Sequence, residues 1–347
     1  MITRTSVLRQ TPLWQIALAQ SITDPAELLE ILQLPVNLLT HAQAGAALFD
    51  LRVPRGFTAR MRRGDIADPL LRQVLPLACE AVSTPGFVHD PVGDCAAMSK
   101  PGVLHKYAGR VLLTATGACA IHCRYCFRRH FPYAQANASS DEWTSALNYI
   151  AADPAITEII LSGGDPLTLS DRRLADFMCK AQAINHVTRV RIHTRLPVVL
   201  PERVTKELLA AFSTSRLRVT MVIHTNHAQE IDDTVRASLD LIKNKGIILL
   251  NQSVLLRGVN DNAQTLITLS ETLFAAGVLP YYLHLLDKVQ GAAHFDVDEQ
   301  TAQILMAEMS VCLPGYLVPR LVREVAGAPH KISIASAALS TQSIAGW

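Results

Sequence analysis

The chain has 347 residues, of which 49% are hydrophobic, and a formal net charge of +2 at pH 7. This length and composition supply a core for one large domain, or for a large domain with a small one. The mild charge balance excludes a protein that holds nucleic acid or an anionic membrane surface by bulk charge. No apolar run approaches the ~20 residues that a membrane span needs.

The seven cysteines are an odd number for a chain of this size and do not suggest a secreted disulfide framework. We therefore expect residence in the cytoplasm.

Residues 1–105 are expected to form a mainly helical and irregular extension. Asp24 is a helix-capping residue, and Pro25 stands at the first helical position after it. The glycine-, proline- and aspartate-rich stretch 83–102 is typical of a long connector.

From Arg110 onward, short runs of β-branched and apolar residues alternate with helical segments. Six strands are predicted, at 110–117, 157–164, 187–194, 218–225, 247–256 and 279–287. Segments such as 141–152 and 233–246 show the helical pattern between them. Strand and helix in alternation predict parallel strands joined by right-handed crossovers. We expect an α/β fold with a partial (β/α)6 TIM-like barrel, because no glycine-rich dinucleotide motif follows the first strand and six units do not close an eight-fold barrel.

Reactive groups of β/α barrels gather at the carboxyl ends of the strands. The unusual residues of this chain follow its predicted strands in that way. They are the cysteines after the first strand, Gly163, Gly164 and Asp165 after the second, His193 and Arg195 after the third, His224 at the end of the fourth and Asp287 at the end of the sixth.

Three cysteines, Cys119, Cys123 and Cys126, fall in the stretch "GACAIHCRYCFRRHF" with the spacing C-x3-C-x2-C. Three buried small hydrophobic residues are one interpretation, since free cysteine is often buried. A zinc site is the second, although such sites usually close with four ligands and a second cysteine pair is missing. The third is a [4Fe–4S] cluster, in which three thiolates leave one iron open to an external ligand.

The cysteine spacing after a first strand resembles the signature of the radical S-adenosylmethionine (SAM) enzymes. In that family the open iron binds SAM, whose reductive cleavage gives a 5′-deoxyadenosyl radical, and the fold is a partial β/α barrel. The segment "LSGGDPL" resembles the family's glycine-rich motif, which implies that Gly163, Gly164 and Asp165 bind SAM.

A narrower resemblance covers about Lys106 to Lys331. The segments "CRYCFRRHF", "LSGGDPL", "RLPVVLPERVT", "LLDKVQGAAHF" and "GYLVPRLVREVAGAPHK" are similar to those of lysine 2,3-aminomutases. In length and in "LDKVQGAAHF" the chain is closest to the short bacterial form that serves elongation factor P. The resemblance implies conversion of L-lysine to (R)-β-lysine, which a separate ligase attaches to the factor.

The resemblance also implies pyridoxal 5′-phosphate (PLP), which supplies the π-system through which the amino group migrates. Lys331 falls at the position of the family's cofactor lysine and is the implied catalytic residue. Lys106, Tyr107, Arg110 and Tyr125 fall where the family holds the cofactor phosphate. His193 and Arg195 are further candidates for contact with the adenosyl group or the cofactor.

Substrate residues are implied in the same way. Arg128 matches the family's arginine for the substrate carboxylate, which a guanidinium binds well. Asp287 and Glu324 match two acidic residues that hold the lysine ammonium, the second usually being aspartate. Two carboxylates at these places favour lysine over glutamate.

We accordingly divide the chain into the extension (1–105), the radical SAM barrel (106–315) and a C-terminal segment that carries the PLP lysine (316–347). The expected partners are free L-lysine, an external reductant such as flavodoxin or ferredoxin, and, as a functional link, elongation factor P and its ligase. No nucleic acid and no membrane is expected. Two hypotheses stay beside this one: a radical SAM aminomutase for another amino acid, and a zinc-stabilised binding module without enzymatic activity.

Overall fold

A sheet of ten strands forms the centre of the computed structural model, which describes residues 11–138 and 143–337. The strands are β1 (Met98–Lys100), β2 (Val103–Tyr107), β3 (Arg110–Thr116), β4 (Glu158–Gly163), β5 (Arg189–Thr194), β6 (Arg218–His224), β7 (Ile248–Val254), β8 (Leu279–His284), β9 (Arg320–Arg323) and β10 (Ile332–Ser333). They lie side by side in chain order. The run from β3 to β9 is parallel, and antiparallel strands flank it.

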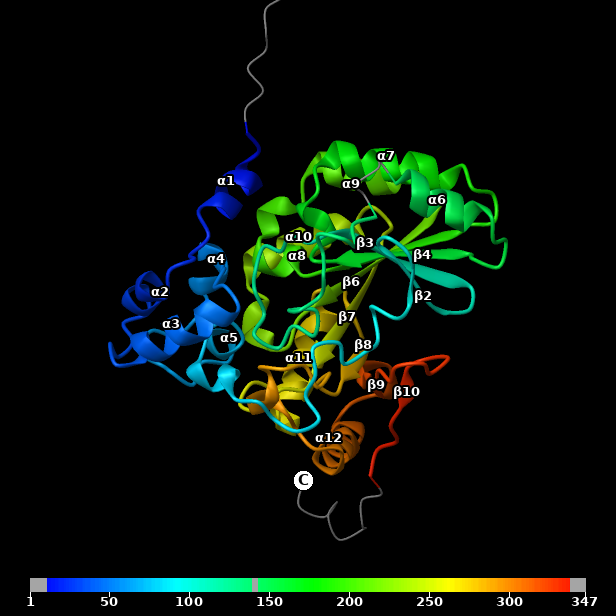
Figure 1. Ribbon diagram of the computed structural model, residues 1–347. Coiled ribbons are helices and arrows are strands. Elements are labelled where there is room, and N and C mark those ends of the chain that lie inside the picture. Colours follow the sequence, from blue (N-terminus) through cyan, green and yellow to red (C-terminus); the bar gives the residue numbers. More distant parts are fainter. Residues whose placement is uncertain (1–10, 139–142, 338–347) are drawn as a thin grey trace, which may run out of the picture.

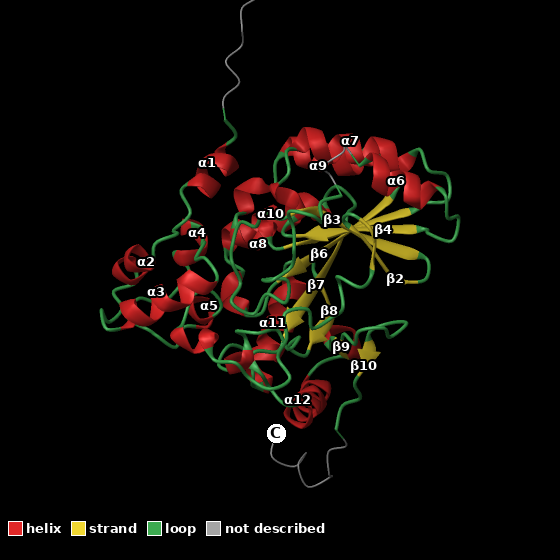
Figure 2. Ribbon diagram, viewed as in Figure 1, coloured by secondary structure: helices red, strands yellow, loops and turns green. Residues whose placement is uncertain are grey.

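Helices connect successive parallel strands and cover the outer face of the sheet (Figures 1 and 2). They are α6 (Thr144–Ala151), α7 (Asp171–Gln182), α8 (Leu196–Val199), α9 (Lys206–Ser213), α10 (Asp233–Lys243), α11 (Ala263–Ala275) and α12 (Glu299–Cys312). Sequential neighbours in one parallel sheet produce a curved wall of β/α units. No strand pairing within the described residues joins β1 to β10, so the barrel is partial, as predicted.

The six predicted strands correspond to β3 to β8 within a few residues at each end. A seventh parallel strand, β9, pairs with β8 and was not predicted. The hairpin of β1 and β2 was also missed, since its first strand lies in the stretch interpreted as a connector. Helix α6 begins at Thr144, and residues 141–142 of its predicted range lie outside the described residues.

Five short helices form the N-terminal extension, which packs as a separate layer beside the barrel (Figure 1). They are α1 (Leu13–Ala19), α2 (Pro25–Ile31), α3 (Leu38–Leu48), α4 (Arg55–Thr58) and α5 (Pro69–Arg72). The predicted cap of α2 is confirmed, because the Asp24 carboxylate accepts a hydrogen bond from the Ala26 amide and Pro25 is the first helical residue. The boundaries at 105 and 315 stay a prediction, although β2 runs through the first and β9 joins the sheet beyond the second.

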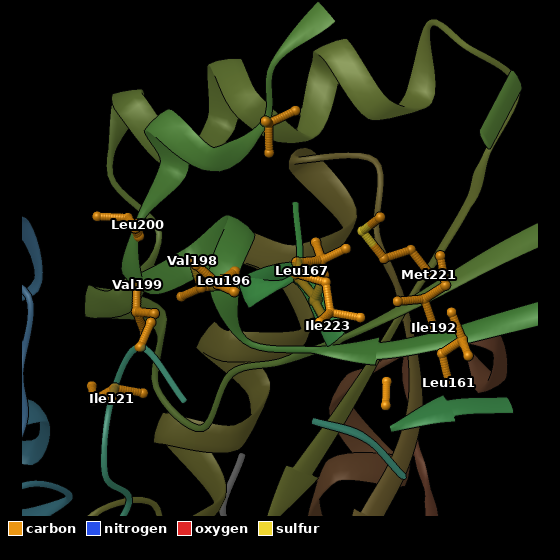
Figure 3. Close-up of a cluster of buried hydrophobic side chains, with 14 of the residues drawn as sticks. Ile121, Leu161, Leu167, Ile192, Leu196, Val198, Val199, Leu200, Met221 and Ile223 are labelled. Carbon is orange, nitrogen blue, oxygen red and sulfur yellow. The ribbon is translucent and has the colours of Figure 1, made fainter. Parts of the chain in front are cut away.

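Apolar side chains of β4, β5 and β6 pack with those of α8 in the largest buried cluster (Figure 3). Leu161, Ile192 and Ile223 are fully buried there. Strands covered on one face by helices and lining a barrel on the other bury side chains on both faces. Among the described residues, no helix has the length and apolarity to cross a membrane.

Candidate active site

A cavity of about 800 Å³ lies inside the barrel wall and extends to the carboxyl ends of the strands. Every predicted site residue lines it, although these residues span positions 106 to 331. They are Lys106, Tyr107, Arg110, Cys119, Cys123, Tyr125, Cys126, Arg128, Gly163, Gly164, Asp165, His193, Arg195, Asp287, Glu324 and Lys331. The structure therefore brings the whole predicted set to one place.

The loop that carries the three cysteines follows β3 directly and is held by the N-terminal extension. The His122 amide donates to the Arg52 carbonyl at 2.9 Å, and the Arg124 amide donates to the Gln73 carbonyl at 2.9 Å. The Arg124 guanidinium also donates to the carbonyl of Phe49 at 2.7 Å. The helical extension thus sets the conformation of the cysteine loop.

The three cysteines line the cavity, and none of them is in a disulfide. No group of three or more His, Cys, Asp or Glu side chains within the described ranges is close enough to hold one metal ion. Three cysteines on one loop would suit a [4Fe–4S] cluster, whose three thiolates bind three different irons.

A buried carboxylate reinforces this loop. Glu80 accepts hydrogen bonds from Arg124 at 2.9 and 2.6 Å and from Arg129 at 2.8 Å. Both Glu80 and Arg124 have no exposed side-chain surface. The ion pair joins the end of the N-terminal extension to the cysteine loop.

Replacing Glu80 by Ala is expected to lower the free energy of unfolding by about 3–5 kcal/mol, because a buried arginine loses its partner. Denaturant unfolding measures the change. Asp240→Ala is the matched control, since its ion pair with Lys243 lies on the surface and is expected to contribute less than about 1 kcal/mol. Equal and small changes in the free energy of unfolding of the two variants would contradict a stabilising role of the buried Glu80 carboxylate.

The two glycines at the end of β4, Gly163 within the strand and Gly164 just after it, allow a close approach to the cysteine loop. A Cβ atom on Gly164 would lie 2.3 Å from the Ala118 carbonyl oxygen, and one on Gly163, whose φ is +116°, would lie 2.7 Å from that of Thr116. The Gly164 amide donates to the Thr116 carbonyl at 2.7 Å. Only glycine fits here, because any side chain would push the loop away.

Asp165 lines the cavity, but its carboxylate is bonded within the protein. It accepts from the Thr194 hydroxyl at 2.7 Å, from the amides of Arg195 and Leu167 at 2.7 and 3.0 Å, and from the Leu196 amide at 3.2 Å. Burial raises the pKa of Asp165, and these bonds partly offset the shift. Its side chain therefore holds the end of β5, and direct contact with a cofactor stays a prediction.

A chain of charged groups crosses one side of the cavity. Arg128 donates from Nε to Asp94 at 2.6 Å and from Nη1 to Ser162 at 3.0 Å. The Lys106 ammonium lies 2.6 Å from the other Asp94 oxygen and 3.6 Å from Glu324. The remaining edge of the Arg128 guanidinium is thus left for a carboxylate.

Asp94 was missed by the sequence interpretation, which placed it in a connector. Burial by itself raises the pKa of this carboxyl, but the charges of Arg128 and Lys106 outweigh it and hold the pKa below its usual value. Asp94 is therefore ionised and sits between the predicted carboxylate-binding arginine and a predicted phosphate-binding lysine. Nothing in the local pattern "PVGDC" marks this role.

Glu324 and Lys331 form an ion pair on the same side. The Tyr107 hydroxyl donates to the other Glu324 oxygen at 2.6 Å. The Arg110 guanidinium stacks 4.6 Å from the centre of the Tyr107 ring. This side of the cavity therefore carries three cationic side chains and one phenol, from Lys106, Arg110, Lys331 and Tyr107. Such a set would suit a phosphate and an aldehyde.

Asp287 differs from Glu324 because its side chain has no hydrogen bond or ion pair among the described residues. Burial raises the pKa of Asp287 to about 7, and nearby Lys331 only partly offsets that rise. An unpaired, half-buried carboxyl that lines a cavity is a candidate for a cationic ligand.

Tyr125 does not join the predicted phosphate group. Its hydroxyl lies 2.8 Å from His224 Nε2 and 3.2 Å from Gln73, on the side of the cysteine loop. Burial lowers the pKa of both His193 and His224, which keeps the two imidazoles neutral. His193 Nε2 is buried and has no hydrogen-bond partner among the residues that the structure describes, so it is available to a ligand.

Comparison with known proteins adds three findings. Residues 113–269 match the Radical SAM superfamily. The chain is 50% identical over 319 residues to the L-lysine 2,3-aminomutase of Escherichia coli (strain K12), covering 92% of this chain and 93% of that protein. It is 46% identical over 325 residues to the L-lysine 2,3-aminomutase of Haemophilus influenzae, covering 94% and 96%. A radical SAM methyltransferase from Sphaerobacter thermophilus superposes with a TM-score of 0.45 at 14% identity, over 64% of this chain and 68% of that one.

Proposed function

The chain belongs to the L-lysine 2,3-aminomutase family of radical SAM enzymes, and we propose that it converts L-lysine to (R)-β-lysine with SAM and PLP. One observation carries the proposal. A single cavity holds the three cysteines, Arg128, Asp287 and Lys331. The radical SAM domain implies a [4Fe–4S] cluster and SAM.

Most of the predicted residues then have a proposed task. Cys119, Cys123 and Cys126 bind the cluster, and the backbone of Gly163 and Gly164 borders SAM. Lys331 holds PLP, which supplies the π-system for the migrating nitrogen, and Lys106, Tyr107 and Arg110 bind its phosphate. His193 contacts the cofactor or the adenosyl group through its unpaired Nε2.

The substrate is proposed to lie between two charged ends. Arg128 binds the α-carboxylate, with Asp94 and Ser162 orienting its guanidinium. Asp287 binds the side-chain ammonium, and Glu324 supports it from the Lys331 side. Both ends of the lysine substrate are thus held in a cavity partly closed to water. Because the substrate is fixed in this way, the radical is restricted to one of its carbons.

The product has a proposed use in the modification of elongation factor P by a separate ligase, which would place the enzyme in the cytoplasm. An external reductant such as flavodoxin or ferredoxin is proposed to supply the electron. The segment "LDKVQGAAHF", which resembles the short bacterial form, supports this route.

Conversion of L-lysine by the reconstituted enzyme under anaerobic conditions, with SAM and a reductant, tests the proposal. Chiral chromatography of the product is expected to show (R)-β-lysine. Turnover of a different amino acid in preference to lysine would replace the substrate assignment, and the absence of any β-amino acid would overturn it.

Lysine binding is expected to strengthen as the pH rises through about 7, the pKa of Asp287. The reason is that the protonated carboxyl is neutral and does not pair with an ammonium, whereas the ionised form does. Below that pKa the affinity should fall by up to about tenfold per pH unit. The pH profile of KM for lysine measures the effect.

Asp287→Asn should remove this pH dependence and raise KM at high pH, and Asp287→Ala should abolish turnover of lysine. Asp176→Asn is the control, because its ion pair with Lys180 lies on the surface of α7. An unchanged lysine KM in Asp287→Asn would show that another group holds the ammonium.

A further inference from the structure

Arg195 reaches the sulfur of a cysteine proposed as a cluster ligand. Its Nη1 donates a hydrogen bond to Cys123 Sγ at 2.8 Å. Among the described residues, no other arginine side chain donates a hydrogen bond to the sulfur of Cys119, Cys123 or Cys126. The guanidinium is 6% exposed, so water screens this contact little.

Three groups orient the Arg195 guanidinium, and a fourth holds its backbone. Nη1 also donates to the Tyr125 hydroxyl at 2.9 Å, and Nη2 donates to Gln73 at 2.6 Å and to Glu230 at 2.9 Å. The Arg195 amide is bonded to Asp165 at 2.7 Å. Gln73 comes from the N-terminal extension and Glu230 from the segment after β6, so the arginine is oriented from several elements.

The ion pair of Arg195 and Glu230 is a buried dipole with a defined direction. Its positive end contacts Cys123, and its negative end lies behind it. Glu230 is fully buried and is also held by Gln73 at 3.1 Å and by the Asn226 amide at 2.9 Å. The positive end of the ion pair therefore faces the sulfur.

We infer that Arg195 tunes the reduction potential of the [4Fe–4S] cluster by its hydrogen bond to the Cys123 sulfur. The inference rests on the proposed function, because it requires the cluster. One electron from a flavodoxin- or ferredoxin-type reductant converts [4Fe–4S]²⁺ to [4Fe–4S]⁺, with no change in the protein's bonds. Hydrogen bonds to cluster sulfurs stabilise the more negative, reduced form and raise the potential.

Glu230 acts in the opposite direction. Its negative charge partly cancels the field of Arg195 at the cluster, so Glu230→Gln is expected to raise the potential. Arg195→Met removes the hydrogen bond and the positive end of the dipole, so it is expected to lower the potential. The two variants break the same ion pair and are predicted to shift the potential with opposite signs.

The test is a redox titration of the reconstituted holoprotein, monitored by electron paramagnetic resonance in the absence of SAM. Arg195→Met is expected to lower the equilibrium constant for reduction by about tenfold or more, which is 59 mV for a one-electron couple. Arg203→Met is the matched control, because Arg203 is a fully buried arginine that donates to backbone carbonyls of Leu167 and Leu169 and to no cysteine.

The inference would be overturned if the reduction potential of Arg195→Met equalled the wild-type value. It would also be overturned if Arg195→Met and Glu230→Gln shifted the potential with the same sign. If Arg195→Met does not assemble a cluster, Glu230→Gln decides alone, with a rise supporting the inference and an unchanged potential overturning it. Failure of the cluster assignment is distinct, since the wild-type protein would then contain no iron and sulfide to titrate. Failure of the lysine aminomutase assignment alone is seen in the turnover assay and leaves the titration possible.

Discussion

Replacing Lys331 by Ala is expected to abolish the binding of PLP and to lower aminomutase activity by at least about 100-fold. The physical reason is that the cofactor loses its covalent anchor, and even a small misplacement of a reacting group costs that much. The Lys331 ammonium faces the cavity beside Glu324 and close to Tyr107 and Lys106, where a phosphate-bearing aldehyde would be held. Analysis of PLP, iron and sulfide in the purified protein measures the outcome.

The cluster should survive in Lys331→Ala, because no hydrogen bond joins Lys331 to a cysteine within the described part of the chain. Lys288→Ala is the matched control, since this lysine is about half exposed, pairs with Asp296 and lies over the Phe87 ring. Iron and sulfide without PLP in both the wild type and the variant would keep the radical enzyme and discard the aminomutase. PLP retained in Lys331→Ala would assign the cofactor to another lysine.

Replacing Cys126 by Ala is expected to prevent assembly of the [4Fe–4S] cluster and to reduce SAM cleavage to the level seen without protein. Only three thiolates are proposed for four irons, so the loss of one leaves two irons without a protein ligand. The Cys126 amide donates to the Cys123 carbonyl at 3.0 Å, which shows that the loop already holds these two residues in one turn. Iron and sulfide content and the rate of 5′-deoxyadenosine formation measure the effect.

Cys179→Ala and Cys312→Ala provide the matched controls, because both thiols are exposed and neither lines the cavity. Both control variants should bind iron and cleave SAM as the wild type does. One zinc ion and no sulfide in the wild type would instead favour the zinc-stabilised binding module.

Much of the fold could be predicted from local patterns. The parallel strands β3 to β8 are runs of apolar residues separated by amphipathic helices, and both periodicities are visible in the sequence. Strand β9 has only four residues, Arg320–Arg323, too few to show a period. Strand β1 is three residues long and lies in a stretch rich in glycine and proline.

The candidate site was predicted only in part, because some of its residues are marked by no local sequence pattern. Residue type and spacing marked Cys119, Cys123 and Cys126, and resemblance to a known family marked Arg128, Asp287 and Lys331. Asp94, Gln73 and Glu230 were not found, since each acts through a partner distant in the chain. Asp165 and Tyr125 were expected at a cofactor, and the structure shows their polar atoms bonded to neighbouring side chains and backbone.

By itself, the sequence determined the order of strands and helices, the cysteine motif and the family. These depend on periods and spacings that act over a few residues. Only the tertiary structure decided which charges meet. Arg195 reaches Cys123, Arg128 reaches Asp94 and Glu324 reaches Lys331, each through the packing of separate elements. Electrostatic interaction in a buried site depends on distance and on the exclusion of water, and neither quantity is encoded in local sequence.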